Sequence, residues 1–357
     1  MGRVIYLLPA RYTRPGKAYD HDDADQAVGA LTSFYMSEKT LFAKERIRDV
    51  FEQCRWGTKK GDIIKVVGLD GVILDFHVDT GDIRPLGDGT ELLLNDPVIE
   101  FEPYHSLIES THHNPDLAYI NMPISHDCTR RDAITKKPIH GVPIQTHEEV
   151  AKFFQDTSQQ WAVSEACQQV ILTFTGIQPL EVTKIVIFAC GPMTTVREED
   201  KLCSRSAFQH ALALTIRDAV AGMAPVGQSG TIPCYIQDPA YSDIDISVLE
   251  KNGFVHLPNP EGFLEVDEST VALSFAPNVP VRQIVSDIAQ PAILIWDTVK
   301  NDGQNDSMMV DPEGKRLQKW TEKLYDVFEF PEDLEHFPTL SIYVRKDGRQ
   351  EYGKTTN

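Results

Sequence analysis

From Thr146 onward, short apolar runs alternate with longer stretches in which apolar residues recur three and four positions apart. The short runs, such as KIVIFA and TVALSFA, predict strands buried on both faces, and the longer stretches predict helices. Regular alternation of this kind is typical of a parallel sheet covered by helices. The predicted strands are 184–189, 231–236, 254–257, 270–276 and 292–297, and the predicted helices are 146–176, 201–221, 242–252, 279–289 and 311–327.

The pattern before Thr146 is less regular. Apolar residues recur at helical spacing over residues 20–55, and Gly57 ends this predicted helical stretch. Two short apolar runs around Asp70–Gly71 predict a β-hairpin. Residues 81–141 have no clear period, so we expect long connections with short elements. The predicted fold is α/β, a Rossmann-like three-layer sandwich with a mainly parallel sheet and an N-terminal α+β elaboration. The expected divisions are the elaboration over 1–145, the core over 146–340 and a C-terminal tail over 341–357.

The composition is that of a soluble globular protein, with 41% hydrophobic and 24% charged residues in 357. No apolar run is long enough to cross a bilayer, and Pro9 and Arg11 interrupt the apolar N-terminus, so we expect a cytoplasmic protein with no membrane partner. The six cysteines are scattered without a CxxC pair, and the histidines lack the HxxxH spacing of a zinc site. We therefore expect no metal. The histidines of the central region are His105, His112, His113, His126 and His140.

The formal net charge of −19 argues against broad, non-specific binding to DNA or to an anionic membrane. One stretch, residues 42–65, is nevertheless rich in lysine and arginine. It could form a local basic face. The favoured interpretation is a solvated helix surface compensated by Glu45, Asp49 and Glu52.

The segment QDPAYSD, Gln237 to Asp243, follows a predicted strand and begins a predicted helix. Turns of this kind carry ligands in open α/β sheets, and this one offers carboxylates and an aromatic hydroxyl. The alternative is a purely structural turn in which Asp238 and Pro239 reverse the chain and Ser242 or Asp243 caps the helix. The side chains that crowd the start of this helix are Asp238, Tyr241, Ser242, Asp243 and Asp245, and the candidate site residues among them are Asp238, Tyr241, Ser242 and Asp243.

Two further loops should reach the same sheet edge, CGPMTT after 184–189 and APNVP after 270–276. The first has neither a GxGxxG nor a P-loop pattern, so we expect no nucleotide cofactor. Cys190 could act as a nucleophile or be a small buried residue, and His210 could act as a base or be a core histidine. Gly191, Thr194 and Asn278 are candidate substrate-binding residues.

Several acids lie between Leu257 and Thr270, beginning with Glu261. Together with the QDPAYSD turn they could form an acidic pocket suited to a guanidinium or ammonium group. For Asp267 and Glu268, solvation at the surface is the favoured interpretation. The acids are Glu261, Glu265, Asp267 and Glu268.

Ordered blocks of the C-terminal half resemble the SRR-like domain (sensitivity to red light reduced), in particular its expanded fungal branch. The blocks are KIVIFACGPM, HALALTIRDAV, QDPAYSDIDISVLEKNGF, FLEVDESTVALSFAPNVPVRQIV and AILIWD. The plant and animal type carries a Pro-His-Cys element where this chain has Pro277-Asn278-Val279. This departure argues against a haem or metal role taken over from those members.

With its long N-terminal region, the chain is similar to the fungal arginine-containing cyclodipeptide synthases of secondary metabolism. That resemblance implies two aminoacyl-tRNA partners, one carrying arginine, and an activity that joins their amino acids into a cyclic dipeptide. An aminoacyl ester is already activated, so the reaction needs only positioning and a general base, for which Tyr241, His210 and Cys190 are the candidates. The main alternative is a non-catalytic SRR-like regulatory or scaffold protein, and a haem-linked binding protein ranks last. The second amino acid and the oligomeric state stay open.

Overall fold

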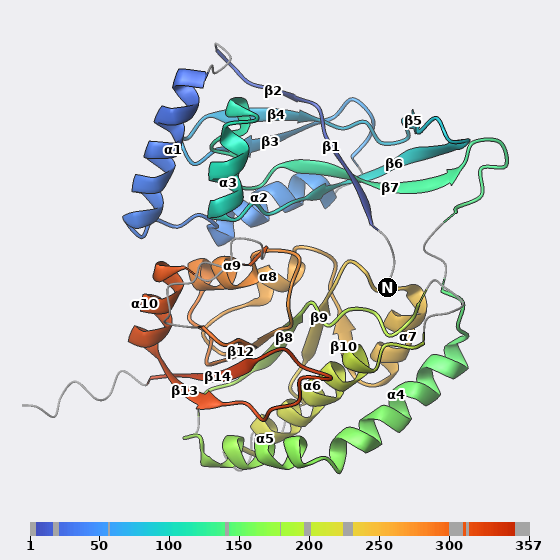
Figure 1. Ribbon diagram of the computed structural model, residues 1–357, viewed down its shortest axis with the longest axis vertical. Helices are drawn as coiled ribbons and strands as arrows, with labels where there is room; N and C mark the ends of the chain where they lie inside the picture. The colour runs from blue at the N-terminus through green and yellow to red at the C-terminus, as the bar shows by residue number, and fades with distance from the viewer. Residues whose placement is uncertain are drawn as a thin grey trace, which may run out of the picture.

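A computed structural model describes residues 5–16, 21–55, 58–139, 143–178, 180–195, 201–223, 231–299, 310–311 and 314–346. The chain forms an N-terminal unit of antiparallel sheets and helices stacked on a C-terminal unit built around one large sheet (Figure 1). Among the described residues, no helix is both long and apolar enough to span a membrane.

The N-terminal unit contains two antiparallel sheets, ordered β1-β7-β6-β5 and β2-β4-β3, with three α-helices around them. The hairpin predicted around Asp70–Gly71 is confirmed as β3–β4. The single helix expected over 20–55 is instead two helices, interrupted near Glu38, which has a positive φ of 59°. The strands are β1 Tyr6–Pro9, β2 Tyr12–Thr13, β3 Ile63–Val67, β4 Ile73–His77, β5 Ile83–Pro85, β6 Thr90–Ile99 and β7 Ile124–Asp132; the helices are α1 His21–Met36, α2 Lys44–Arg55 and α3 Tyr104–Thr111.

Residues 81–141 are more ordered than expected, because β5, β6 and β7 form most of one sheet. Their period-2 pattern is hidden because polar residues occupy buried positions as well, as in the sequence ISHDCTRRD of β7, where Ser125 and His126 are buried. Pairing across the sheet, rather than an apolar run, therefore forms these strands.

The C-terminal unit contains a seven-stranded sheet in the order β10-β9-β8-β11-β12-β14-β13. The first five strands are parallel and the last two antiparallel, which confirms a mixed α/β fold with a mostly parallel sheet. The strands are β8 Lys184–Phe188, β9 Cys234–Gln237, β10 Phe254–His256, β11 Thr270–Ser274, β12 Ile293–Asp297, β13 Tyr325–Glu329 and β14 Leu340–Arg345; the helices are α4 His147–Ala162, α5 Glu165–Gly176, α6 Ser204–Met223, α7 Asp243–Lys251, α8 Glu261–Glu265, α9 Val281–Ile288 and α10 Lys315–Leu324.

Three boundaries differ from the sequence-based expectation. The helix expected over 146–176 is α4 and α5, because Ser164 caps a second helix. The helix expected over 311–327 ends at Leu324, where β13 begins. The expected C-terminal tail starts at 341, whereas Leu340–Arg345 forms β14 inside the sheet, between β12 and β13.

Both faces of the large sheet are covered (Figure 1). Ile185 and Ile187 of β8 pack with α4, α5 and α6 on one face, and Val186 and Phe188 pack on the other with α8 and α9. Phe101 of the N-terminal unit joins this second core and lies edge-on to Phe263 of α8, with 5.3 Å between ring centroids. The N-terminal unit is therefore packed on the sheet through a shared core.

The strand order places a topological switch point between β8 and β11. From β8 the chain proceeds to β9 and β10 on one side, and then returns to β11 and β12 on the other. In open α/β sheets, ligands bind outside the carboxyl ends of the strands at such a point. A ligand site is therefore expected at the loops after β8, β9 and β11.

Candidate functional site

The carboxyl edge of the sheet has an unusual backbone at the switch point. Ala189 directly follows β8 and has a φ of 59°, and Ala276 follows β11 with a φ of 46°. Residues other than glycine rarely adopt this left-handed conformation, which costs free energy and is concentrated at functional sites. The two strained alanines flank the switch point.

The carboxylate of Asp238 links the loops after β8 and β9. Its Oδ2 accepts a hydrogen bond from the Gly191 N–H at 2.8 Å, and its Oδ1 accepts one from the Ala240 N–H at 2.9 Å. Burial raises the pKa of Asp238, and the two N–H donors oppose that rise. Because both oxygens already accept backbone hydrogen bonds, this carboxylate serves first to hold the two loops together.

Asp245 makes a second, more extensive link between these loops. This fully buried carboxylate accepts hydrogen bonds from the N–H groups of Met193, Thr194 and Ser242 and from the hydroxyls of Thr194 and Ser242, at 2.6–3.0 Å. Ser242 is the N-cap of α7 and forms a capping box with Asp245, so the capping alternative is confirmed for Ser242. Asp243, the first residue of the helix, is exposed.

The three candidate catalytic side chains come together beneath these loops. The Tyr241 hydroxyl donates to His210 Nε2 at 2.8 Å, because His210 Nδ1 donates to the Ser206 carbonyl at 2.7 Å and leaves Nε2 as the acceptor. Burial lowers the pKa of His210 to about 4, so the ring is neutral at pH 7. Burial, followed by the charges of Cys190 and Asp238, raises the pKa of Tyr241 well above its usual value, and burial together with Asp238 does the same for Cys190. Cys190 and Tyr241 are only 4% exposed and His210 is 0% exposed.

Glu261 and Asn278 lie outside this hydrogen-bonded cluster. Glu261 begins α8 and forms an ion pair with Arg55 of α2 at 3.4 Å. Asn278 is exposed in the loop after β11. Both residues follow strands of the parallel sheet but contribute no hydrogen bond to the Asp238 and Asp245 links among the described residues.

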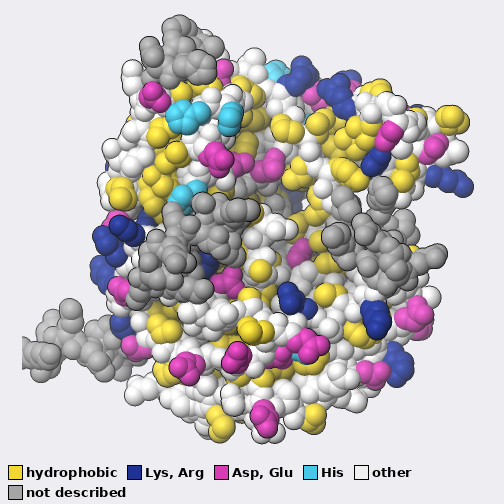
Figure 2. Space-filling view, in the orientation of Figure 1, with side chains coloured by type: hydrophobic (Ala, Val, Ile, Leu, Met, Phe, Trp, Pro, Cys, Tyr) yellow, Lys and Arg dark blue, Asp and Glu magenta, His cyan; other side chains and the backbone are white. Residues whose placement is uncertain are grey.

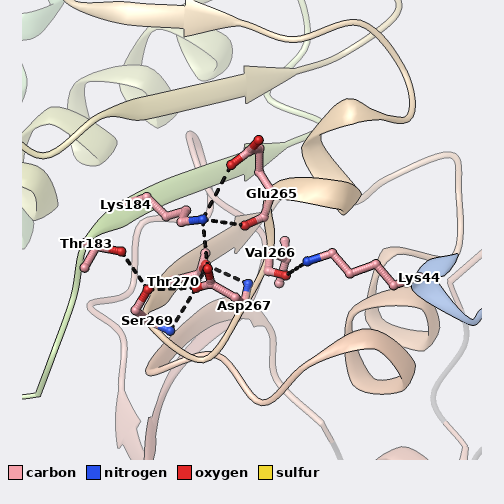
Figure 3. Close-up of polar contacts among 8 residues, drawn as sticks. All are labelled: Lys44, Thr183, Lys184, Glu265, Val266, Asp267, Ser269 and Thr270. Atoms are coloured by element: carbon pink, nitrogen blue, oxygen red, sulfur yellow. Dashed lines mark hydrogen bonds and ion pairs between the residues drawn. The ribbon is translucent and has the colours of Figure 1, made fainter. Parts of the chain in front are cut away.

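The acids that precede β11 lie at the opposite edge of the sheet. Lys184, the first residue of β8, pairs with Asp267 at 2.8 Å and with Glu265 at 3.4 Å (Figure 3). Burial raises the pKa of Asp267, but Lys184, Ser269 and Thr270 outweigh burial and lower it to about 2. The expectation that Glu265 could share an acidic pocket with the QDPAYSD turn is therefore wrong, because the two groups lie at opposite ends of the strands.

Three cations of the basic stretch at residues 42–65 are paired with acids that lie outside it, rather than with Glu45, Asp49 and Glu52 as the favoured interpretation expected. Lys65 pairs with Asp75 at 2.8 Å, Lys60 pairs with Asp82, and Arg55 pairs with Glu261. On the face shown in Figure 2, lysine and arginine side chains are scattered among acids. Among the described histidines, His126 is buried and bonded to Asp79 and Asn95, whereas His140 lies outside the described residues. The described part of the chain contains no group of three His, Cys, Asp or Glu side chains placed to hold a metal ion.

Residues 170–346 match the SRR1 domain family. The chain carries an SRR1 domain. The match runs from within α5 to the end of β14, so the SRR1 domain includes the entire seven-stranded sheet and the cluster of Cys190, His210 and Tyr241. The resemblance expected from the ordered blocks is confirmed to this extent, while no comparison supports a resemblance to cyclodipeptide synthases.

Similarity outside this family is distant. No curated protein matches the chain. Cofactor-bound Rv0187 from MTB is 10% identical with a TM-score of 0.29, over 56% of this chain and 89% of that one. The SAM-dependent O-methyltransferase from Thermotoga maritima is 9% identical with a TM-score of 0.27, over 87% of this chain and all of that one.

Proposed function

We propose that this SRR1-domain protein is a tRNA-dependent aminoacyltransferase that joins arginine and a second amino acid into a cyclic dipeptide. The observation that carries the proposal is the Tyr241–His210 hydrogen bond beside Cys190, at the carboxyl edge of the sheet next to its switch point. Acid–base groups gathered at this edge are the usual starting point for an enzyme of this architecture.

The chemistry asks little of the protein beyond positioning and proton transfer. The amine of one aminoacyl group attacks the ester carbonyl of the other, so that a C–N bond forms, the ester C–O bond breaks and the ribose oxygen of the first tRNA leaves. The free amine of the resulting dipeptidyl-tRNA then attacks the remaining ester carbonyl, so that a second C–N bond closes the ring and the ribose oxygen of the second tRNA leaves. The amine must lose a proton and the leaving oxygen must gain one. The Tyr241 hydroxyl can relay these protons because neutral His210 accepts from it at 2.8 Å.

A direct transfer suits Cys190 better than a covalent one. Burial and Asp238 raise the pKa of the thiol, so the reactive thiolate is disfavoured at neutral pH. In the proposed reaction Cys190, Gly191 and Thr194 therefore shape the loop that positions the ester, and no aminoacyl-enzyme forms. Asp238 and Ser242 anchor that loop. Asp243 and Asn278 are exposed at this edge, so an incoming substrate can contact them, whereas half-buried Glu261 becomes available once its ion pair with Arg55 opens.

The proposed reaction requires that the substrate reach the buried catalytic side chains. Cys190, His210 and Tyr241 are at most 4% exposed, so the loop after β8 must move aside before an ester reaches them. Gly191 has a φ of 69° next to the strained Ala189, and a segment with such backbone angles is suited to switching between two conformations. Loop opening would then limit turnover.

The same burial favours a second candidate, a non-catalytic regulatory or scaffold protein. In that case the Tyr241–His210 bond and the Asp238 and Asp245 links are core interactions that hold the loops after β8 and β9 in place against α6. The two functions differ in what Tyr241→Phe changes. In a scaffold protein, Tyr241→Phe lowers only the stability. In a synthase, it also lowers the turnover of protein that is still folded.

The test is to incubate the purified protein with a mixture of charged tRNAs that includes arginyl-tRNA, and to search for cyclic dipeptides by mass spectrometry. We expect an arginine-containing cyclic dipeptide, about 10²-fold slower formation with Tyr241→Phe, and substantial formation with Cys190→Ala. No product from wild-type protein with any charged tRNA would refute the synthase. A denaturation-stable aminoacyl-enzyme that disappears in Cys190→Ala would establish the covalent route instead.

A further inference from the structure

A pair of glutamates in the N-terminal unit lies on one face of an extended strand pair. Beyond Ile99, the pairing of β6 with β7 continues, because the Glu100 N–H donates to the Pro123 carbonyl at 3.0 Å and the Glu102 N–H to the Asn121 carbonyl at 2.9 Å. Directly opposed residues share a face of the sheet, and so do residues two apart on one strand. Glu100, Glu102 and Asn121 therefore share one face, while Phe101 points into the core on the other.

This face is rich in hydrogen-bond acceptors and poor in donors. Glu102 is half-buried and forms no hydrogen bond or ion pair with any described side chain, and burial and Glu100 raise its pKa. The carboxylate of Glu100 accepts only the Ser125 hydroxyl among the described residues. Asn121 is 1% exposed; its Nδ2 donates to the Leu41 carbonyl, and its buried Oδ1 accepts from no described donor.

The buried, unpaired Oδ1 of Asn121 beside two half-buried carboxylates calls for a partner that brings several N–H groups. No described lysine or arginine pairs with Glu100 or Glu102, so the two carboxylates repel each other, and a cation between them would remove that repulsion. A guanidinium has five N–H donors in a planar fork and binds carboxylates in pairs of hydrogen bonds, so it matches this acceptor set better than an ammonium group.

The glutamate pair is connected to the carboxyl edge of the SRR1 domain. Asn259 Nδ2 donates to the Ile99 carbonyl at 3.2 Å, and Asn259 Oδ1 accepts from Gln237 Nε2 at 3.3 Å. Gln237 directly precedes Asp238 in the turn after β9. Two hydrogen bonds thus join the strand that carries Glu100 and Glu102 to the loop that anchors the candidate catalytic cluster.

We infer that Glu100, Glu102 and Asn121 form a subsite for the guanidinium group of an arginine-type ligand. The choice of arginine rests on the proposed function, whereas the acceptor cluster does not depend on it. In this arrangement the N-terminal unit selects the amino acid and the SRR1 domain carries out the transfer. The guanidinium is bound by Glu100 and Glu102, and the Asp238 carboxylate keeps its structural bonds.

The test uses L-arginine methyl ester as the probe and titration calorimetry with the full chain. L-Norleucine methyl ester has the same α-ammonium and ester but no guanidinium, so it reports whether the side chain is recognised. The variants are Glu102→Gln and Glu100→Gln, with Glu109→Gln on the exposed face of α3 as the matched control. Circular dichroism and thermal melting verify that each variant is folded; the substitutions keep the shape of the side chain and remove a repulsion.

We expect arginine methyl ester to bind at least about 10-fold more tightly than norleucine methyl ester, Glu102→Gln to weaken it about 10-fold or more, and Glu109→Gln to leave it unchanged. Equal affinity for the two esters, or an unchanged affinity in Glu102→Gln, would overturn the subsite. Glu102-dependent binding in a protein that makes no cyclic dipeptide would leave the subsite intact and refute the synthase. Formation of the arginine-containing product that is unaffected by Glu102→Gln would refute the subsite and leave the synthase intact.

Discussion

The acidic side chains at the two edges of the parallel sheet are stabilised by different partners. At the amino edge, Asp267 and Glu265 pair with Lys184 at the surface (Figure 3). At the carboxyl edge, half-buried Asp238 and fully buried Asp245 accept hydrogen bonds from backbone N–H groups and hydroxyls instead of pairing with a cation. The difference shows that the amino edge is closed by local charge pairs, whereas the carboxyl edge uses its acids to fix the loops after β8 and β9 around Tyr241 and His210.

The largest expected effect comes from the acid that holds the carboxyl edge together. Asp245→Ala leaves the N–H groups of Met193, Thr194 and Ser242 buried without their acceptor, and we expect it to lower the free energy of unfolding by about 3–5 kcal/mol. Urea unfolding measures the change. Asp243→Ala, two residues away and exposed, is the control and should cost no more than about 1 kcal/mol at the helix N-terminus. Equal small losses for the two variants would show that the Asp245 link is not needed.

The second effect is the pH dependence of stability that His210 causes at the carboxyl edge. The pKa of His210 is lowered to about 4 in the folded protein, below the usual value of about 6.5, so the unfolded chain binds the proton more readily. The stability contributed by neutral His210 is therefore complete above about pH 6.5 and is lost as the pH falls toward 4. We expect a loss of about 2–3 kcal/mol over this range, measured as the difference between wild type and His210→Gln.

Wild type is compared with His210→Gln because Asp311 changes the free energy of unfolding with pH in the direction opposite to His210. Burial raises the pKa of Asp311 to about 6, although Arg282 opposes that rise, so its contribution to stability decreases as the pH rises from about 4 to 6 in both proteins. Parallel pH profiles for wild type and His210→Gln would mean that His210 is charged or solvated in the folded state.

The smallest effect is expected at the amino edge. Asp267→Asn removes a partly exposed partner of Lys184 and should cost about 1 kcal/mol or less, because solvent and salt screen such pairs. Since the pKa of Asp267 is lowered to about 2, its contribution is present above about pH 4 and is lost as the pH falls toward 2. A loss at neutral pH as large as that of Asp245→Ala would erase the distinction between the edges.

Much of the fold could be predicted because the parallel strands are continuous apolar runs, and their order along the chain brings the loops after β8 and β9 together. Strand β14 and the sheet of β5, β6 and β7 could not, since pairing with distant strands decides them. The candidate site could be predicted from the sequence only in part. Residue types identified Tyr241 and His210, but no local pattern shows that Lys184 pairs with Asp267, 83 positions away, or that Glu100 and Glu102 lie opposite Asn121.

The most direct test of the account compares the rate of cyclic dipeptide formation for one variant at each edge. Tyr241→Phe removes the hydroxyl that His210 accepts, and Lys184→Met removes the charge that Asp267 and Glu265 share. If the carboxyl edge carries out the transfer, wild type and Lys184→Met form the arginine-containing product at similar rates, and folded Tyr241→Phe forms it about 10²-fold more slowly. Product formation that is equal in all three proteins, or absent from wild type, would contradict the account.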